Sequence, residues 1–336
     1  MRTSRLDRFA VLGVVAVLGG MLFGPAGTSA AFLVSTDNPG NTYTAIPDWK
    51  PPIISRATVI KTEGGLPGYV RTGGTYAVVA GVIDDPSSNP PAGIASVQTN
   101  ISALTAASTA LSMPASASTV NGLTYTHRSA TQTVATGKAA GTYSGTVASS
   151  DLVTPPNTSA AFTFAPVVDN TAPSGSSVTV TNGGVANRPD SGDTVTFTWN
   201  EPIDPTSIIS GWDGSGSQIV TVQVANKGNG DSVYVYNSTN TTQLPLGVIA
   251  LKTTDYVTSS TTFGGPTNAT RSTMTWNSTT GAFTVLLGPA DAAGTVNTTA
   301  TTTSQLIWTP QSTAFDRAGN LSTTTAWTQP SATRKF

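Results

Sequence analysis

Cysteine is missing altogether from the 336 residues of this chain. Without it there is no disulfide framework, no thiolate nucleophile and no cysteine-based metal site. Stability must therefore come from the packing of secondary structure. A chain of this length has room for two domains of ordinary size, and each of them can bury a core of its own.

Charged residues are scarce as well. They make up 10% of the chain, and the net charge is only -1, whereas a typical globular domain is about 25% charged. This balance gives no attraction for nucleic acid or anionic lipid, so we expect no nucleic-acid partner. The chain is instead rich in Thr, Ser, Asn and Gly. Threonine and valine favour strands, and Gly, Asn and Pro favour the turns between them, which predicts an all-β protein.

Residues suited to acid–base chemistry are few. Histidine occurs once, at His127, without a Gly-x-Ser-x-Gly sequence, and we interpret it as a strand residue near solvent rather than a member of a catalytic triad. Glutamate occurs only at Glu63 and Glu201. Glu201 and Asp204 are close in sequence, and a glycosidase needs two carboxylates, but prolines frame both in a turn. We predict that the chain is not an enzyme.

The first 30 residues have the three parts of a secretory signal peptide. Arginines form the positive start, residues 9–23 are almost wholly apolar, and Thr28-Ser29-Ala30 places small residues at a cleavage position. The apolar run is shorter than the roughly 20 residues that span a bilayer. We predict a cleaved signal peptide at 1–30, a secreted or cell-surface location, and membrane contact only through this segment before cleavage. An uncleaved anchor is the alternative.

Residues 31–52 form an N-terminal strand segment and linker. Residues 31–45 contain a short apolar strand, an Asn-Pro-Gly turn and a second alternating strand. Directly after a signal peptide, this stretch resembles the N-terminus of camelysin and TasA-type exported fibre proteins, and of secreted actinobacterial-type Gram-positive proteins. The resemblance implies self-association, in which this strand completes the sheet of a neighbouring subunit. Pairing within its own chain is the alternative.

Two series of short alternating segments follow. They occupy 53–166 and 174–328, with a hinge at 167–173 between them and a tail at 329–336. In the second series Val195, Phe197 and Trp199 alternate with threonines, which predicts a strand with one buried face. The strands predicted in the first series are 57–62, 75–83, 95–102, 123–134, 141–148 and 160–165.

Both series resemble known β modules. The sequence Val-Ala-Gly-Val-Ile-Asp-Asp…Gly-Ile-Ala-Ser-Val at 79–97 is similar to bacterial Ig-like and cadherin-like modules. The second series opens with Thr-Val-Thr-Phe-Thr-Trp-Asn-Glu-Pro-Ile-Asp-Pro (194–205) and ends with Asp-Arg-Ala-Gly-Asn (316–320). This pair resembles bacterial Ig-like surface domains of the S-layer type. The resemblances imply two tandem Ig-like antiparallel β-sandwiches after the signal peptide.

Calcium is the one cofactor for which the sequence offers ligands, because it takes oxygens from carboxylates, carbonyls and Asn. Asp84 and Asp85 would meet the hinge pair Asp169 and Asn170 at one end of the first sandwich, as at a cadherin-like junction. Asp316 and Asn320 would form a similar group in the second sandwich. Ordinary turn chemistry is the alternative reading of these residues, and the chain then needs no cofactor.

Five of the six tryptophans lie in the second series. Trp199 and Trp308 share strand faces with apolar residues, so we expect both in the core. Trp212 lies in a turn-rich Gly-Trp-Asp-Gly-Ser-Gly sequence, and we expect its ring to be exposed and available to stack on a sugar.

The sequence therefore predicts a secreted or cell-surface protein of the bacterial envelope with a structural or adhesive role. The first alternative is a carbohydrate- or protein-binding module, whose partner is an envelope glycan or protein. The second alternative is a secreted hydrolase.

Overall fold

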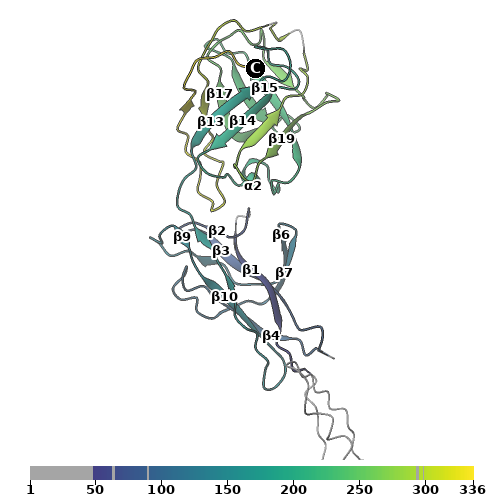
Figure 1. The fold of residues 1–336 in the computed structure, drawn as a ribbon, viewed down its shortest axis with the longest axis vertical. Coiled ribbons are helices and arrows are strands. Elements are labelled where there is room, and N and C mark those ends of the chain that lie inside the picture. The colour runs from purple at the N-terminus through teal and green to yellow at the C-terminus, as the bar shows by residue number, and fades with distance from the viewer. Residues whose placement is uncertain (1–47, 63–64, 89–90, 293–294, 298) are drawn as a thin grey trace, which may run out of the picture.

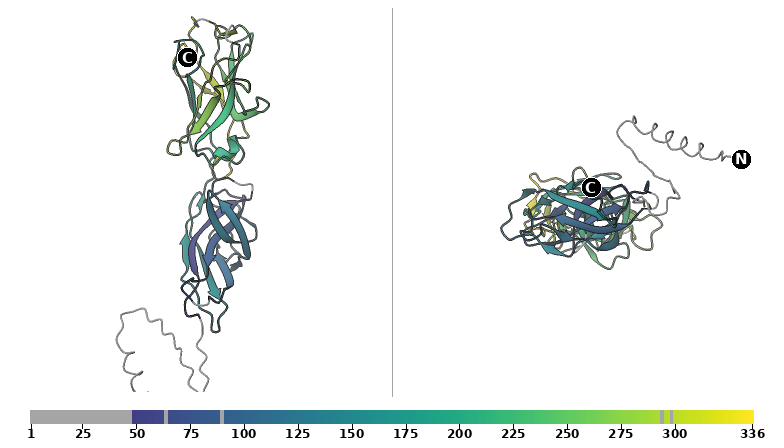
Figure 2. Two further views of the ribbon diagram at one scale, coloured as in Figure 1. Left: turned by 90° about the vertical axis from the view of Figure 1, so that its right-hand side faces the viewer. Right: turned by 90° about the horizontal axis from the view of Figure 1, so that it is seen from below.

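The computed structural model describes residues 48–336 except 63–64, 89–90, 293–294 and 298. The predicted signal peptide and the segment 31–47 lie outside the described residues. The described chain is almost entirely β, with one short helix, α2 (Pro205–Ile208). Two separate hydrophobic clusters, one within residues 59–168 and one within 178–336, form the cores of two sandwiches. These lie end to end (Figures 1 and 2), and the predicted all-β fold is confirmed.

The described residues of the first sandwich form twelve strands in three sheets. One sheet has the order β1-β3-β7-β6 with β8 beside β3, a second has the order β11-β10-β4-β5, and a small third has the order β2-β12-β9. All pairs are antiparallel except β12 with β2. The bounds are β1 (Ile53–Lys61), β2 (Tyr69–Val70), β3 (Thr75–Ile83), β4 (Ile94–Asn100), β5 (Leu111–Ser112), β6 (Ala115–Val120), β7 (Leu123–Arg128), β8 (Gln132–Thr133), β9 (Gly141–Thr142), β10 (Gly145–Asp151), β11 (Phe162–Phe164) and β12 (Val167–Val168).

Strand β3 is the centre of the first core. It pairs with β1 over its whole length and with β7 and β8 on its other side. Tyr76, Val78 and Ala80 are completely buried, as their alternation predicts. Ala77 and Val79 between them are also completely buried, so both faces of β3 are covered. A strand that is buried on both faces has a continuous apolar sequence. Residues Tyr76 to Ile83 form such a run.

The described residues of the second sandwich form one continuous sheet of ten strands. Its order is β13-β14-β20-β19-β15-β16-β17-β21-β22, with β18 beside β15. The bounds are β13 (Gly175–Thr181), β14 (Thr194–Trp199), β15 (Ser217–Ala225), β16 (Ser232–Tyr236), β17 (Gln243–Ala250), β18 (Thr261–Phe263), β19 (Ser272–Trp276), β20 (Phe283–Leu286), β21 (Ile307–Thr309) and β22 (Trp327–Thr328).

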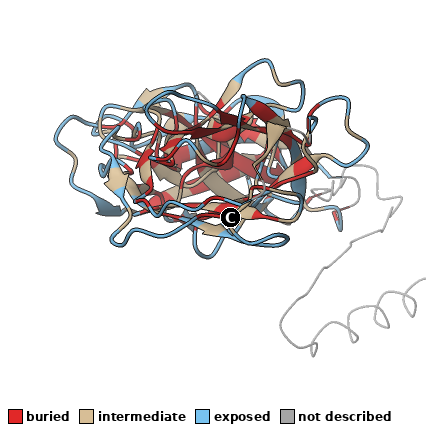
Figure 3. Cartoon of the chain, turned by 90° about the horizontal axis from the view of Figure 1, so that it is seen from above, coloured by how far each residue is buried: buried red, intermediate tan, exposed pale blue. Residues whose placement is uncertain are grey.

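Strand β15 belongs to both layers of the second sandwich. Its first four residues pair with β19, and its last five pair with β16. The two layers enclose an aromatic core in which Trp199 and Trp308 meet edge to face, with ring centroids 4.8 Å apart. Figure 3 shows the buried residues gathered between the layers and the exposed ones in the surrounding loops. The predicted burial of Trp199 and Trp308 is confirmed.

Candidate metal centres

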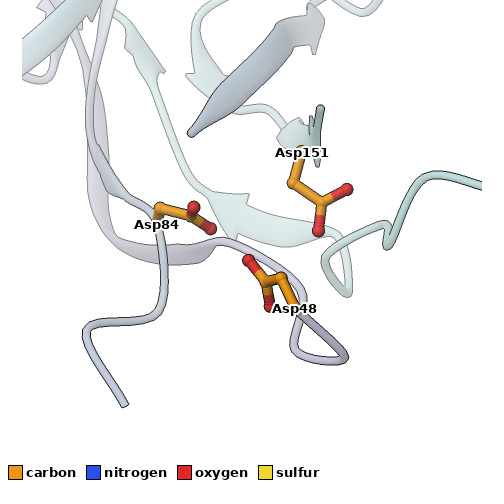
Figure 4. Close-up of side chains that lie close together, drawn as sticks. All are labelled: Asp48, Asp84 and Asp151. Carbon is orange, nitrogen blue, oxygen red and sulfur yellow. The ribbon is translucent and has the colours of Figure 1, made fainter. Parts of the chain in front are cut away.

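Three aspartates meet at the end of the first sandwich that lies away from the second. Asp48 precedes β1, Asp84 follows β3, and Asp151 ends β10. One carboxylate oxygen of each lies within 4.8 Å of the others, and the three side chains point toward one another (Figure 4). We call this group the distal cluster. Antiparallel pairing brings the start of β1 and the end of β3 together in one sheet, and the end of β10 in the second sheet lies at the same end of the sandwich.

Hydrogen-bond donors already occupy the distal cluster. Asp48 accepts from Ser88 Oγ at 2.5 Å and from the backbone N–H groups of Lys50 and Ala92, both at 3.0 Å. Burial alone would raise the pKa of Asp48, but these hydrogen bonds outweigh it and lower the pKa. Asp84 accepts from the Gly93 N–H at 2.5 Å, and Asp151 from the Asn157 backbone N–H at 2.9 Å. The three side chains thus tie the loops at this end together as hydrogen-bond acceptors.

A second carboxylate group lies where the two sandwiches meet. Asp169 follows β12, Glu201 follows β14, and Asp316 lies in the loop after β21, with one oxygen of each within 4.8 Å of the others. We call this group the junction cluster. Asn320 links its parts, because its side-chain N–H₂ donates to Asp316 Oδ2 at 2.8 Å and to the Asp169 carbonyl at 2.9 Å.

The surroundings of the junction cluster disfavour the ionised forms of Glu201 and Asp316. Burial, the charges of Asp169 and Asp316, and a hydrogen bond with Asp169 together raise the pKa of Glu201 from its usual 4.5 to about 7. Burial also raises the pKa of Asp316, although Asn320 and backbone N–H groups oppose the shift. Glu201 Oε1 is buried without a hydrogen-bond partner among the described residues. Either a proton or a cation would relieve this repulsion.

An ion pair and two hydrogen bonds, each between a side chain and a backbone group, connect the sandwiches beside the junction cluster. Lys61 Nζ lies 3.5 Å from Asp204 Oδ2, and both side chains are buried. Lys61 Nζ also donates to the Arg317 carbonyl, and the Leu66 N–H donates to Asp204 Oδ2 at 2.7 Å. Asp204 additionally caps α2 by accepting from the Thr206 N–H. The same carboxylate therefore caps the N-terminus of α2 in the second sandwich and binds Lys61 and the Leu66 N–H of the first sandwich.

A cavity of about 290 Å³ opens at this junction. Residues of both sandwiches line it, including Lys61, Arg71, Phe315 and Leu321. Its wall is mainly apolar, and the Leu321 side chain is 60% exposed.

The predicted calcium site is wrong in its grouping. Asp84 lies in the distal cluster and Asp169 in the junction cluster, because β3 carries the chain about 30 Å between the two ends of the first sandwich. Asp85 belongs to neither group and accepts from the Ser87 N–H in a turn. Asn170 accepts from the Thr72 N–H and donates to the Lys138 carbonyl. The structure instead joins Asp169 to Asp316.

Sequence reasoning missed three members of the two clusters. Asp48 precedes β1 and Asp151 ends β10, which lie in different sheets, so their meeting depends on how the two sheets pack and not on any local pattern. Glu201 was considered only together with Asp204. The two side chains are separated by their turn: Glu201 lies in the junction cluster, whereas Asp204 faces Lys61 and Leu66.

The expected exposure of two further residues is also wrong. The Trp212 ring is only 4% exposed, because its loop folds back and its Nε1 donates to the Ser215 carbonyl at 2.8 Å. The ring packs edge to face on Phe283 and offers no open surface to a sugar. His127 is 8% exposed, since it lies opposite the buried Ala80 in the ladder between β7 and β3. Burial lowers the pKa of His127.

No protein-family model and no curated protein match this chain. Among solved structures, the chain is similar to FdeC, described as a novel broadly conserved Escherichia coli adhesin that elicits protection against urinary tract infections. The two chains are 14% identical with a TM-score of 0.22, and the match covers 80% of this chain and 64% of that chain. This chain thus spans less than two thirds of the FdeC structure. Within the described residues, no helix is long and apolar enough to cross a membrane.

Proposed function

We propose that this chain is an exported bacterial surface protein in which two β-sandwiches form one stiff, non-catalytic unit with a structural or adhesive role. The observation that carries the proposal is the buried junction. Lys61 from the first sandwich pairs with Asp204 from the second, and neither side chain is more than 5% exposed. A flexible linker would leave such groups in water.

The junction resists bending because separating the sandwiches breaks several interactions together. Buried charges cost several kcal/mol when a partner is removed, about 3–5 kcal/mol for a buried ion pair. Opening would also break the hydrogen bond from the Leu66 N–H to Asp204, and the bonds from Asn320 to Asp169 and from the Thr323 N–H to the Pro173 carbonyl. A stiff pair of modules suits a spacer that holds a binding surface away from the cell.

Export and stiffness are tested separately. The full chain, expressed in a Gram-positive host, should lose residues 1–30 and be labelled by a biotin reagent that does not cross membranes. Intact, unlabelled protein in the cytosol contradicts export. Small-angle scattering of the mature protein should give one elongated particle with a single maximum dimension between pH 5 and 8 in moderate salt. A broad distribution of dimensions contradicts the stiff unit.

A further inference from the structure

One outer face of the second sandwich carries two aromatic rings. Tyr234 and Tyr236 alternate along β16 with Val233 and Val235, which are 2% and 1% exposed in the core. Both tyrosines therefore project from the opposite side of the sheet. Their ring centroids are 6.4 Å apart, and the rings are tilted by 44°. We call this surface the tyrosine face.

The polar groups of the tyrosine face are free to bind a ligand. Among the described residues, none forms a hydrogen bond with the hydroxyl of Tyr234 or Tyr236, whereas the hydroxyls of Tyr76, Tyr143 and Tyr256 all have partners. Gln223 lies opposite Tyr234 in the ladder, and its amide also has no described partner. Gln243 lies opposite Tyr236 and uses only its N–H₂, which donates to the Gly247 carbonyl.

The tyrosine face is also uncharged. None of the strands β15, β16, β17, β18, β21 and β22 contains an Asp, Glu, Lys or Arg. The guanidinium of Arg271 near one end is engaged with the carbonyls of Gly264 and Ser238. Burying charge against a neutral partner is costly, and an anionic partner needs cations, so a face without charge fits an uncharged ligand.

The dimensions of the tyrosine face favour a chain molecule over a second copy of this protein. The three longer strands, β15, β16 and β17, lie about 4.8 Å apart and have about three outward positions each, which gives an area of roughly 300 Å². A stable protein interface buries about 800 Å² per partner. An extended glycan lying across β15, β16 and β17 would contact both rings and both glutamines within this smaller area.

We propose that the tyrosine face binds an uncharged polysaccharide. The C–H faces of its sugar rings stack on Tyr234 and Tyr236, and its hydroxyls bond to Gln223 and to the tyrosine hydroxyls. The inference deepens the proposed adhesive function by naming the class of partner, and it rests on that function for its biological setting. The binding itself is a property of the purified protein.

The test measures retention of the mature protein on insoluble cellulose and chitin, and affinity for soluble laminarin and dextran, with polygalacturonate as an anionic probe. We expect binding to at least one uncharged probe and none to polygalacturonate. Tyr234→Ala/Tyr236→Ala should weaken that binding by about tenfold or more, whereas Tyr234→Phe/Tyr236→Phe, which keeps the rings, should weaken it less. Trp49→Ala is the matched control, because that ring is 67% exposed on the first sandwich, and it should change nothing.

A second measurement needs no variant. Tetranitromethane should nitrate Tyr234 and Tyr236 in the free protein, and the bound polysaccharide should slow both reactions relative to Tyr69. Absence of binding to every uncharged probe, or equal binding by the double Ala variant and the wild type, overturns the inference. A dimer that the double Ala variant loses also overturns it, because a second copy then covers the face. Exported protein that binds no glycan leaves the proposed function intact.

Discussion

The distal and junction clusters contain the same kind of side chain in different surroundings. In the distal cluster, backbone N–H groups and Ser88 point at the carboxylates of Asp48, Asp84 and Asp151. In the junction cluster, Asp316 accepts from its own loop and from Asn320, but Glu201 Oε1 has no donor among the described residues. Three close carboxylates are thus held by hydrogen-bond donors in one place, whereas in the other they include a carboxylate oxygen without a donor.

The difference shows that donors, rather than the spacing of carboxylates, decide what an acidic cluster does. A carboxylate that accepts two or three hydrogen bonds keeps its charge at little cost. A carboxylate without donors holds a proton or attracts a cation. The distal cluster therefore acts as a structural tie between loops, whereas the junction cluster is sensitive to the solution around it.

The largest effect is expected from Asp48→Ala, which should lower the free energy of unfolding of the first sandwich by about 4 kcal/mol. The substitution leaves the buried Ser88 hydroxyl and the partly buried N–H groups of Lys50 and Ala92 without an acceptor, and a buried donor that loses its partner costs about 1–3 kcal/mol. Urea unfolding followed by circular dichroism measures it. Asp85→Ala, which removes a turn acceptor outside the cluster, is the control and should cost far less than Asp48→Ala. Equal effects from both variants would contradict the structural role of the distal cluster.

Lys61→Met should come next, with a loss of about 3 kcal/mol. It leaves Asp204 buried without its ion-pair partner. The second readout is the scattering profile, which should broaden as the sandwiches begin to move independently. Arg71→Met is the control at the same junction, because Arg71 is exposed and forms no ion pair among the described residues. An unchanged profile in Lys61→Met would show that other contacts hold the junction.

Glu201→Gln should stabilise the protein by about 1–2 kcal/mol above pH 7, a value discounted from the full pKa shift because the side chain is partly exposed. The folded state holds the Glu201 proton up to a pKa of about 7, and the unfolded state only to 4.5. Wild-type stability should therefore fall as pH rises from about 4.5 to about 7. The variant should remove this part of the pH dependence. Thermal unfolding at several pH values checks it, and a variant less stable than wild type at pH 8 would contradict the repulsion.

The smallest effect is expected from calcium. At pH 8, where Glu201 is ionised, calcium at ten times its dissociation constant should add about 1.4 kcal/mol. At pH 5 the proton on Glu201 competes, and the gain should vanish. Melting temperatures in calcium and in chelator measure both, with Glu201→Gln as the matched variant that loses the gain. If the melting temperature in calcium equals that in chelator at pH 5 and also at pH 8, the junction cluster does not bind calcium.

Much of the fold could be predicted from local patterns. The bounds of β3 and β14 match the predicted ranges 75–83 and 194–199, because both strands alternate strongly or are continuously apolar. β13 was not predicted, since its sequence Gly-Ser-Ser-Val-Thr-Val-Thr has few apolar residues. It forms a strand because it pairs with the neighbouring β14. The predicted strand 123–134 is interrupted between Arg128 and Gln132.

The clusters were harder to predict than the strands. Asp169 and Asp316 were each recognised as turn aspartates, but their meeting depends on how two sandwiches dock, which no local pattern encodes. Trp212 was misjudged for a similar reason. Glycine and serine around it are typical of an exposed loop, yet Phe283 from a distant strand provides the surface on which its ring packs.

The pairing of β1 with β3 has a mechanical consequence. The start of β1 lies at the far end of the first sandwich, and the second sandwich lies beyond the opposite end (Figure 1). Tension along the molecule would pull β1 parallel to its own axis. The hydrogen bonds between β1 and β3, from Ile53 to Lys61, run across that direction. Such a load shears these hydrogen bonds all together rather than one by one, so the pairing of β1 with β3 is arranged to withstand force.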